Sequence, residues 1–135
     1  PPRSIDELTH AFFSVFDNRR GTAPDLSRLS QMFVERAIIT RRDDHLLDVM
    51  SLDEFVAPRQ DLFNTGKLVD FHEWEVESQT FLDGGIATRI CEYKKEGVLE
   101  GEPFSGGGTK SIQFVQVAEG WRIASVLWED ADPRD

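Results

Sequence analysis

Apolar residues recur every three or four positions in the first part of the chain, which is the spacing of an α-helix. Ser4 and Glu7 match a capping box, and the apolar pattern behind them continues to about Asp17. Thr22 and Pro24 begin a second such segment, because proline is tolerated in the first turn of a helix. The residues expected to face the core are Ile5, Leu8, Phe12, Val15, Phe16, Leu26, Leu29, Met32 and Phe33. The pattern predicts two amino-terminal helices.

A third helix is predicted to begin at a second Ser-x-x-Glu capping box at Ser51 and to end at 64–66, where Asn-Thr-Gly follows the last apolar position. Pro58 lies inside this helix and lacks a donor N–H, so we expect a kink there. Upstream, segments 37–40 and 46–50 are short and apolar, and they predict either edge strands or a hairpin.

After residue 66 the apolar period changes from about 3.6 to about 2, the period of a β-strand. This alternation predicts four long strands, over residues 68–81, 85–95, 109–118 and 121–130. Glycine-containing turns join them, and we expect the three successive glycines at 106–108 to form a flexible hairpin tip within the loop 96–108. The predicted fold class is α+β, with amino-terminal helices packed on a strongly curved antiparallel sheet that forms a cup.

Size and composition fit one folded domain over residues 1–135. The chain is 39% hydrophobic and 30% charged, which is too apolar for a disordered segment and too charged for a membrane protein. No apolar run approaches the roughly 20 residues that cross a bilayer, and no leader sequence opens the chain, so we expect a cytoplasmic location. The net charge of -10 opposes binding to nucleic acid, which draws on clustered Lys and Arg.

Motifs that carry chemistry are few. The sequence has no phosphate loop, no nucleophile elbow and no paired cysteines, and we expect neither a cofactor nor a metal ion. His45 lies in a charged turn without further ligands at defined spacing. Cys91 is the single cysteine and alternates with apolar residues, so it is expected to be a buried thiol.

Two segments resemble a known family. The helix SLDEFVAPRQDLFNTG at 51–66 and the closing segment KSIQFVQVAEGWRIASVLWED at 110–130, together with the order of the helices, resemble the SnoaL-like branch of the nuclear transport factor 2-like superfamily. The resemblance implies a cone-shaped α+β fold, frequent dimers, and a pocket between the helices and the concave face of the sheet. Members include ketosteroid isomerases, scytalone dehydratase, polyketide cyclases and epoxide hydrolases, beside many proteins that only bind or scaffold.

Ketosteroid isomerases of this family place a tyrosine on the first helix and an aspartate general base on an early strand. Here the first helix has Phe12, Phe13 and Phe16, and the early strand has Ile38 and Ile39. The sequence therefore departs from the residues that steroid isomerisation needs, and the resemblance leaves the activity open.

His72 beside Trp74 is the candidate general base, because nearby carboxylates can tune the pKa of a histidine toward neutral pH. Alternation places His72 and Trp74 on the drier face of their strand and Glu73, Glu75 and Glu77 on the other, unless a β-bulge turns part of this row inward. The alternative is an exposed or capped histidine without a chemical role.

Polar side chains among small apolar ones predict a ligand pocket. Arg89 and Tyr93 share one face of a predicted strand, Gln113 lies on the next strand and Trp128 on the last. With Trp74 they are typical of the lining of a small-molecule pocket, and equally of a wet dimer interface. The opposite parity of these strands is also apolar, so both sheet faces require cover and we expect a homodimer through the sheet.

Arg59 is the remaining candidate for ligand binding. It follows the kinking Pro58, so its guanidinium can point into the cup and hold a carboxylate. The alternative is a surface ion pair with Asp61 or Glu54.

The sequence favours a small-molecule-binding domain for a small hydrophobic or aromatic ligand. A second possibility is a cofactor-independent isomerase, dehydratase or cyclase in which His72 is the base and Tyr93, Arg89 and Gln113 position an oxygen. A third is a non-catalytic assembly module whose polar face contacts a partner subunit.

Overall fold

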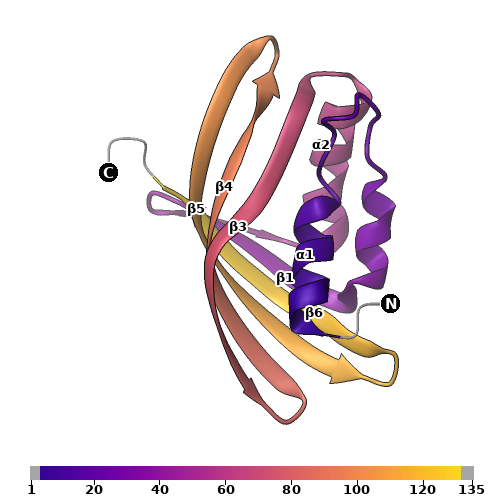
Figure 1. Ribbon diagram of the computed structural model, residues 1–135, viewed down its shortest axis with the longest axis vertical. Coiled ribbons are helices and arrows are strands. Elements are labelled where there is room, and N and C mark those ends of the chain that lie inside the picture. The colour runs from indigo at the N-terminus through magenta and orange to yellow at the C-terminus, as the bar shows by residue number, and fades with distance from the viewer. Residues whose placement is uncertain (1–3, 132–135) are drawn as a thin grey trace.

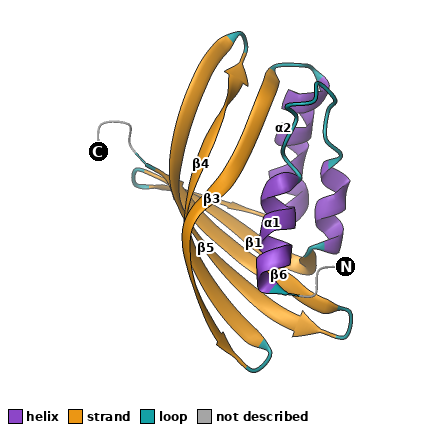
Figure 2. Cartoon of the chain, viewed as in Figure 1, coloured by secondary structure: helices purple, strands orange, loops and turns teal. Residues whose placement is uncertain are grey.

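The computed structural model describes residues 4–131. Its helices lie on the concave side of a strongly curved sheet (Figure 1). The helical elements are α1 (Ile5–Ser14), the 3-10 helix η1 (Leu26–Gln31) and α2 (Leu52–Asn64). The strands are β1 (Phe33–Asp43), β2 (Leu46–Met50), β3 (Leu68–Asp83), β4 (Ile86–Leu99), β5 (Glu102–Val117) and β6 (Gly120–Asp130). The chain therefore has the predicted α+β class, with two layers and an open, curled sheet (Figure 2).

Local capping signals place the helix starts. The side chain of Ser4 accepts a hydrogen bond from the Glu7 backbone N–H at 3.1 Å, and α1 begins at the next residue. The second predicted capping box, at Ser51, is complete and begins α2. The helix predicted from Pro24 is instead the six-residue η1, which is capped by Asp25 and ends at Gln31, because the chain passes directly into β1.

The sheet has six strands in the order β2-β1-β6-β5-β4-β3. Strands β3 to β6 form the predicted antiparallel meander. Segments 37–40 and 46–50 form the predicted hairpin within β1 and β2, with Ile39 opposite Met50. The sheet as a whole is mixed, because β1 runs parallel to β6. The sequence did not predict this parallel pairing of β1 with β6.

The prediction of a loop over residues 96–108 is wrong. Strands β4 and β5 continue through it and turn only at Glu100 and Gly101, both at positive φ. The three glycines lie inside β5, where Gly108 is opposite Tyr93. A Cβ added at Gly108 would come within 2.1 Å of the Glu129 carbonyl oxygen, so glycine here permits close approach of two strands.

Register shifts decide which side chains face the helices. Strand β3 has shifts between Val69 and His72 and between Glu75 and Glu77. A further shift in the pairing of β5 with β6 places both Trp121 and Trp128 among the buried residues, although their spacing is odd. Because cross-strand partners share a face, Glu73 lies with inward Lys95, whereas Trp74 lies with exposed Lys94.

Candidate functional site

A cavity of about 440 Å³ lies between α1, α2 and the concave face of the sheet. Its volume is within the range of about 300–1,000 Å³ that is usual for small-molecule sites. Its apolar lining is Phe12, Phe16, Phe55, Pro58, Leu62, Phe63, Leu68, Phe71, Leu99, Phe104 and Trp128. Its charged lining is Arg41, Arg59, Glu73, Lys95, Lys110 and Asp130. The cavity therefore combines a largely aromatic wall with charged side chains from six different elements.

Edge-to-face ring contacts fix the aromatic wall. Phe55 of α2 meets Phe16, in the turn after α1, with ring centroids 6.0 Å apart, and Trp128 of β6 at 5.7 Å. Phe71 of β3 stacks on Phe104 of β5 at 6.2 Å. Such pairs are stabilising beyond their buried area, so the wall is rigid and joins helices to sheet.

Lys110 is the most buried charged group of the lining. Its side chain is 7% exposed, and its Nζ lies 3.5 Å from Oε2 of Glu73, whose side chain is 12% exposed. The same Nζ lies 4.2 Å from the ring centroid of Tyr93 and 5.2 Å from that of Trp128. Burial lowers the pKa of Lys110, and Glu73 opposes that shift.

The carboxylate of Asp130 interacts with three donor side chains. The hydroxyl of Tyr93 donates a short hydrogen bond to its Oδ1, and Nζ of Lys95 lies 3.0 Å from the same oxygen. A guanidinium nitrogen of Arg41 lies 3.5 Å from Oδ2. Burial tends to raise the pKa of Asp130, but Tyr93 and Lys95 together hold it below its usual value. Burial, and then Asp130, raise the pKa of Tyr93.

Arg59 has a guanidinium that no carboxylate of the described residues approaches within 4.0 Å. It donates one hydrogen bond, to the Phe55 carbonyl oxygen at 2.9 Å, and lies 4.0 Å above the Phe55 ring. Its Cζ is 5.6 Å from the centroid of Trp128. Burial, and then the charge of Arg41, lower the pKa of Arg59. The structure places this guanidinium in the cup, and not in the alternative surface pair with Asp61 or Glu54.

Arg89 lies on the concave face but outside the cavity lining. Its guanidinium makes two hydrogen bonds to Glu75, at 2.6 and 2.9 Å, one to Asp6 at 2.7 Å and one to Thr80 at 2.8 Å. These bonds occupy its donors and tie α1 to the edge of the sheet. The guanidinium of Arg89 is therefore bound by side chains of the chain itself.

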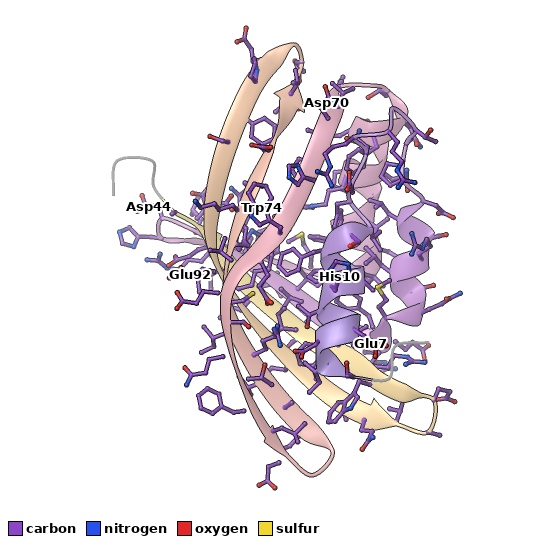
Figure 3. The ribbon with its side chains drawn as sticks, in the orientation of Figure 1. Glu7, His10, Asp44, Asp70, Trp74 and Glu92 are labelled. Carbon is purple, nitrogen blue, oxygen red and sulfur yellow. The ribbon has the colours of Figure 1, made fainter. Side chains whose placement is uncertain are left out.

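Three other predicted site residues lie away from the cavity. His72 stacks on Trp74 with ring centroids 4.4 Å apart, and its Nε2 lies 3.8 Å from Oε1 of Glu96. His72 and Trp74 lie instead in a separate surface pocket beside α1, where they are neighbours of His10 and Phe13 (Trp74 and His10 are labelled in Figure 3). Gln113 is exposed on the outer face, where it accepts a hydrogen bond from Thr88 at 2.9 Å. Neither His72, Trp74 nor Gln113 lines the cavity.

Sequence reasoning missed most of the charged lining. Glu73 was placed on the outer row, and only the register shifts of β3 turn it inward. Lys110 carried a usable signal, because it shares strand parity with Ile112 and Phe114, which are almost completely buried. A lysine in phase with such residues marks an interior cation.

The structure also bears on thiol chemistry, metal binding and membrane-spanning helices. Burial raises the pKa of Cys91 to about 12, so its thiol stays protonated at neutral pH. Among residues 4–131 no group of three or more His, Cys, Asp or Glu side chains is arranged to hold a metal ion. No helix within that range has the length and apolar character to cross a membrane.

Solved structures share this fold. A protein from Kribbella flavida has a TM-score of 0.73 at 16% identity and covers 95% of this chain and 88% of its own. A nuclear transport factor 2-like protein with a cystatin-like fold from Novosphingobium aromaticivorans has a TM-score of 0.70 at 17% identity, covering 96% and 80%. A nuclear transport factor 2-like protein from Cytophaga hutchinsonii has a TM-score of 0.71 at 6% identity, covering 94% and 95%.

No family model and no curated protein sequence matches the chain. At the identities of the structural neighbours, the likeness establishes the fold and leaves the function to the site. The alignments cover 94–96% of this chain and 80–95% of the other chains, so the likeness extends over the whole fold. The chain therefore has the fold of the nuclear transport factor 2-like superfamily.

Proposed function

We propose that the cavity binds a small, partly aromatic molecule that carries one negatively charged group. The observation that carries this proposal is the charge of the lining. The chain as a whole has a net charge of -10, yet four cationic side chains face two carboxylates in the cavity. Even with Lys110 neutral, the cations remain in excess. A locally positive cavity in an acidic protein favours an anionic ligand.

Arg59 is the proposed seat of the anion. Asp130 already has Tyr93, Lys95 and Arg41 as partners, and Glu73 has Lys110. The guanidinium of Arg59 has free donors and a planar shape that matches a carboxylate. The surrounding rings would cover the apolar part of the ligand. This supports the SnoaL-like type of small-molecule site proposed from the sequence.

Thermal denaturation with matched ligands tests the proposal. We expect 3-phenylpropanoate to raise the midpoint temperature more than its uncharged amide, because a ligand that binds the folded state stabilises it by mass action. Arg59→Met should weaken carboxylate binding at least about tenfold, since a hydrogen bond to a charged group contributes about 1.5–3 kcal/mol. Arg28→Met, at an exposed position of η1, is the matched control. Equal stabilisation by acid and amide would contradict the proposal.

Acid/base catalysis on the bound anion is the second candidate function. It is favoured by the contact of Glu73 with Lys110 inside the cavity, which pairs a proton acceptor with a proton donor. The base proposed here is Glu73 rather than His72, because only Glu73 lines the cavity. No cofactor is invoked. Glu73→Gln should abolish any turnover of a bound ligand, and full activity of that variant would exclude Glu73 as the base.

We also propose that the chain acts as one domain and as a homodimer, with the outer face of the sheet as the interface. On that face Ile90 of β4 and Leu127 of β6 both pair with Ser111 of β5, and they are 47% and 51% exposed. Ile38 and Phe81 extend the apolar area, at 53% and 56% exposed. A patch of this kind is typical of a surface covered by a second copy. The cytoplasmic location stays a prediction.

A further inference from the structure

Lys110 has the surroundings of a nucleophilic amine. Its Nζ projects from β5 into the cavity, between the rings of Tyr93, Trp128 and Phe13 at 4.2, 5.2 and 5.7 Å. Among the described residues, its one carboxylate within 4.0 Å is that of Glu73, at 3.5 Å. The amine of Lys110 is surrounded by aromatic rings and has a single proton acceptor beside it. In this it differs from a lysine that forms a solvent-exposed ion pair at the surface.

The electrostatics favour the neutral form that attacks carbonyl carbon. Burial is the main factor that lowers the pKa of Lys110, and the positive charge of Lys95 adds to it. The charges of Glu73, Cys91 and Asp130 act in the opposite direction. A lysine that is desolvated and lies near another cation is the recognised arrangement for amine catalysis.

We propose that Lys110 forms an imine with the carbonyl group of a small oxo acid bound in the cavity. The inference rests on the anion-binding function proposed above and adds the chemical class of the ligand. The lone pair of the neutral amine attacks the carbonyl carbon, and the carbonyl electrons move to oxygen, which takes up a proton. The resulting carbinolamine loses water and gives the imine, so amine and ketone are converted to imine and water. No oxidant or reductant is needed.

The positions of Arg59 and Lys110 define the ligand. Both groups lie against the same indole: Cζ of Arg59 is 5.6 Å and Nζ of Lys110 is 5.2 Å from the centroid of the Trp128 ring. Because both groups line the same cavity beside this ring, the proposed ligand has its carboxylate at Arg59 and its ketone at Lys110. Glu73 takes each of the two protons that the nitrogen loses, and passes the first to the carbonyl oxygen and the second to the departing hydroxyl. The aromatic wall covers the remaining apolar part and excludes water from the imine.

Reductive trapping tests this step in the full chain. The protein is incubated with phenylpyruvate and sodium cyanoborohydride, which reduces an imine to a stable secondary amine, and the modified lysine is located by peptide mass mapping. We expect labelling at Lys110, and its loss in Lys110→Met and in Lys110→Arg. Lys94→Met is the matched control, because Lys94 is an exposed lysine of β4 and its removal should leave the labelling of Lys110 unchanged. Peptide mass mapping of the wild-type protein identifies the labelled lysine even if a variant fails to fold.

Two results would overturn the inference in distinguishable ways. If 3-phenylpropanoate raises the midpoint temperature but phenylpyruvate labels only exposed lysines or none, the imine is excluded and the anion-binding function stands. If neither carboxylate raises the midpoint temperature and Lys110 is unlabelled, the proposed function fails together with this inference.

Discussion

Gly108 of β5 lies so close to Tyr93 of β4 that a Cβ at this glycine would be 2.7 Å from the tyrosine hydroxyl and 2.1 Å from the Glu129 carbonyl oxygen. The hydroxyl in turn donates to Asp130. Gly108 therefore allows β4, β5 and β6 to approach one another closely next to the carboxylate of Asp130, which lines the cavity. Any side chain at this position must displace either backbone or the hydrogen bond.

Gly108→Ala should destabilise the protein by about 1–3 kcal/mol, since overpacking against backbone cannot be relieved by a change of rotamer. Urea denaturation measures the change in the free energy of unfolding. Gly106→Ala is the control, because its added Cβ would meet only the Lys95 side chain, with Cε at 3.4 Å. Similar effects of the two substitutions would show that the close approach at Gly108 is unimportant.

Tyr93→Phe should lower the free energy of unfolding at neutral pH by about 1–3 kcal/mol, because Asp130 loses a buried hydrogen bond to its charged form. The pKa of Asp130 is held below its usual 3.8, so this contribution is present above that value and is lost as the pH falls through the lower, folded-state value. Urea denaturation at several pH values should therefore show the difference from wild type shrinking below about pH 3.8. A difference that grows in acid would contradict this account.

Local signals in the sequence predicted the helix starts but not the extent of the strands. The capping box of Ser51 is a contact within one turn, so four residues suffice to recognise it. A glycine has two physical uses, a turn or a close approach of two backbones, and the sequence does not distinguish them. Gly107 and Gly108 serve the second use, which is why a predicted loop is strand.

Two of the predicted site residues, Arg59 and Trp128, line the cavity. Arg59 was predicted from its place directly after Pro58, which is a signal local to α2. On β3 two register shifts reverse the predicted faces, so Glu73 lines the cavity, whereas His72 and Trp74 do not. Because such shifts depend on pairing with β4, the period of one strand alone could not reveal them.

The free energy of unfolding should rise with pH, over the range between the lowered folded-state pKa of Lys110 and about 10.5. Burial lowers the pKa of this amine in the folded state, whereas the unfolded chain keeps its proton up to about 10.5. The folded state thus binds fewer protons, and stability increases with pH by up to about 1.4 kcal/mol per unit. In Lys110→Met this rise should be absent.

The measurement must stay below about pH 9, where Cys91 acts in the opposite direction. Burial raises the pKa of this thiol to about 12, so its contribution is lost as the unfolded chain ionises at 9.0 and above. Denaturation of wild type and Lys110→Met at matched pH values gives the slope directly. Parallel slopes in the two proteins would mean that Lys110 remains charged in the fold.

Leu127→Lys should convert the proposed dimer to a monomer. Leu127 lies on the outer face between Thr40 and Ser111, so a lysine from each copy would introduce charge into the centre of an apolar interface. Light scattering after size exclusion should give about twice 15.4 kDa for wild type and about 15.4 kDa for the variant. Leu46→Lys, at an exposed end of β2, is the control and should leave the mass unchanged. A monomeric wild type would exclude the dimer, and a dimeric Leu127→Lys would move its interface away from this face.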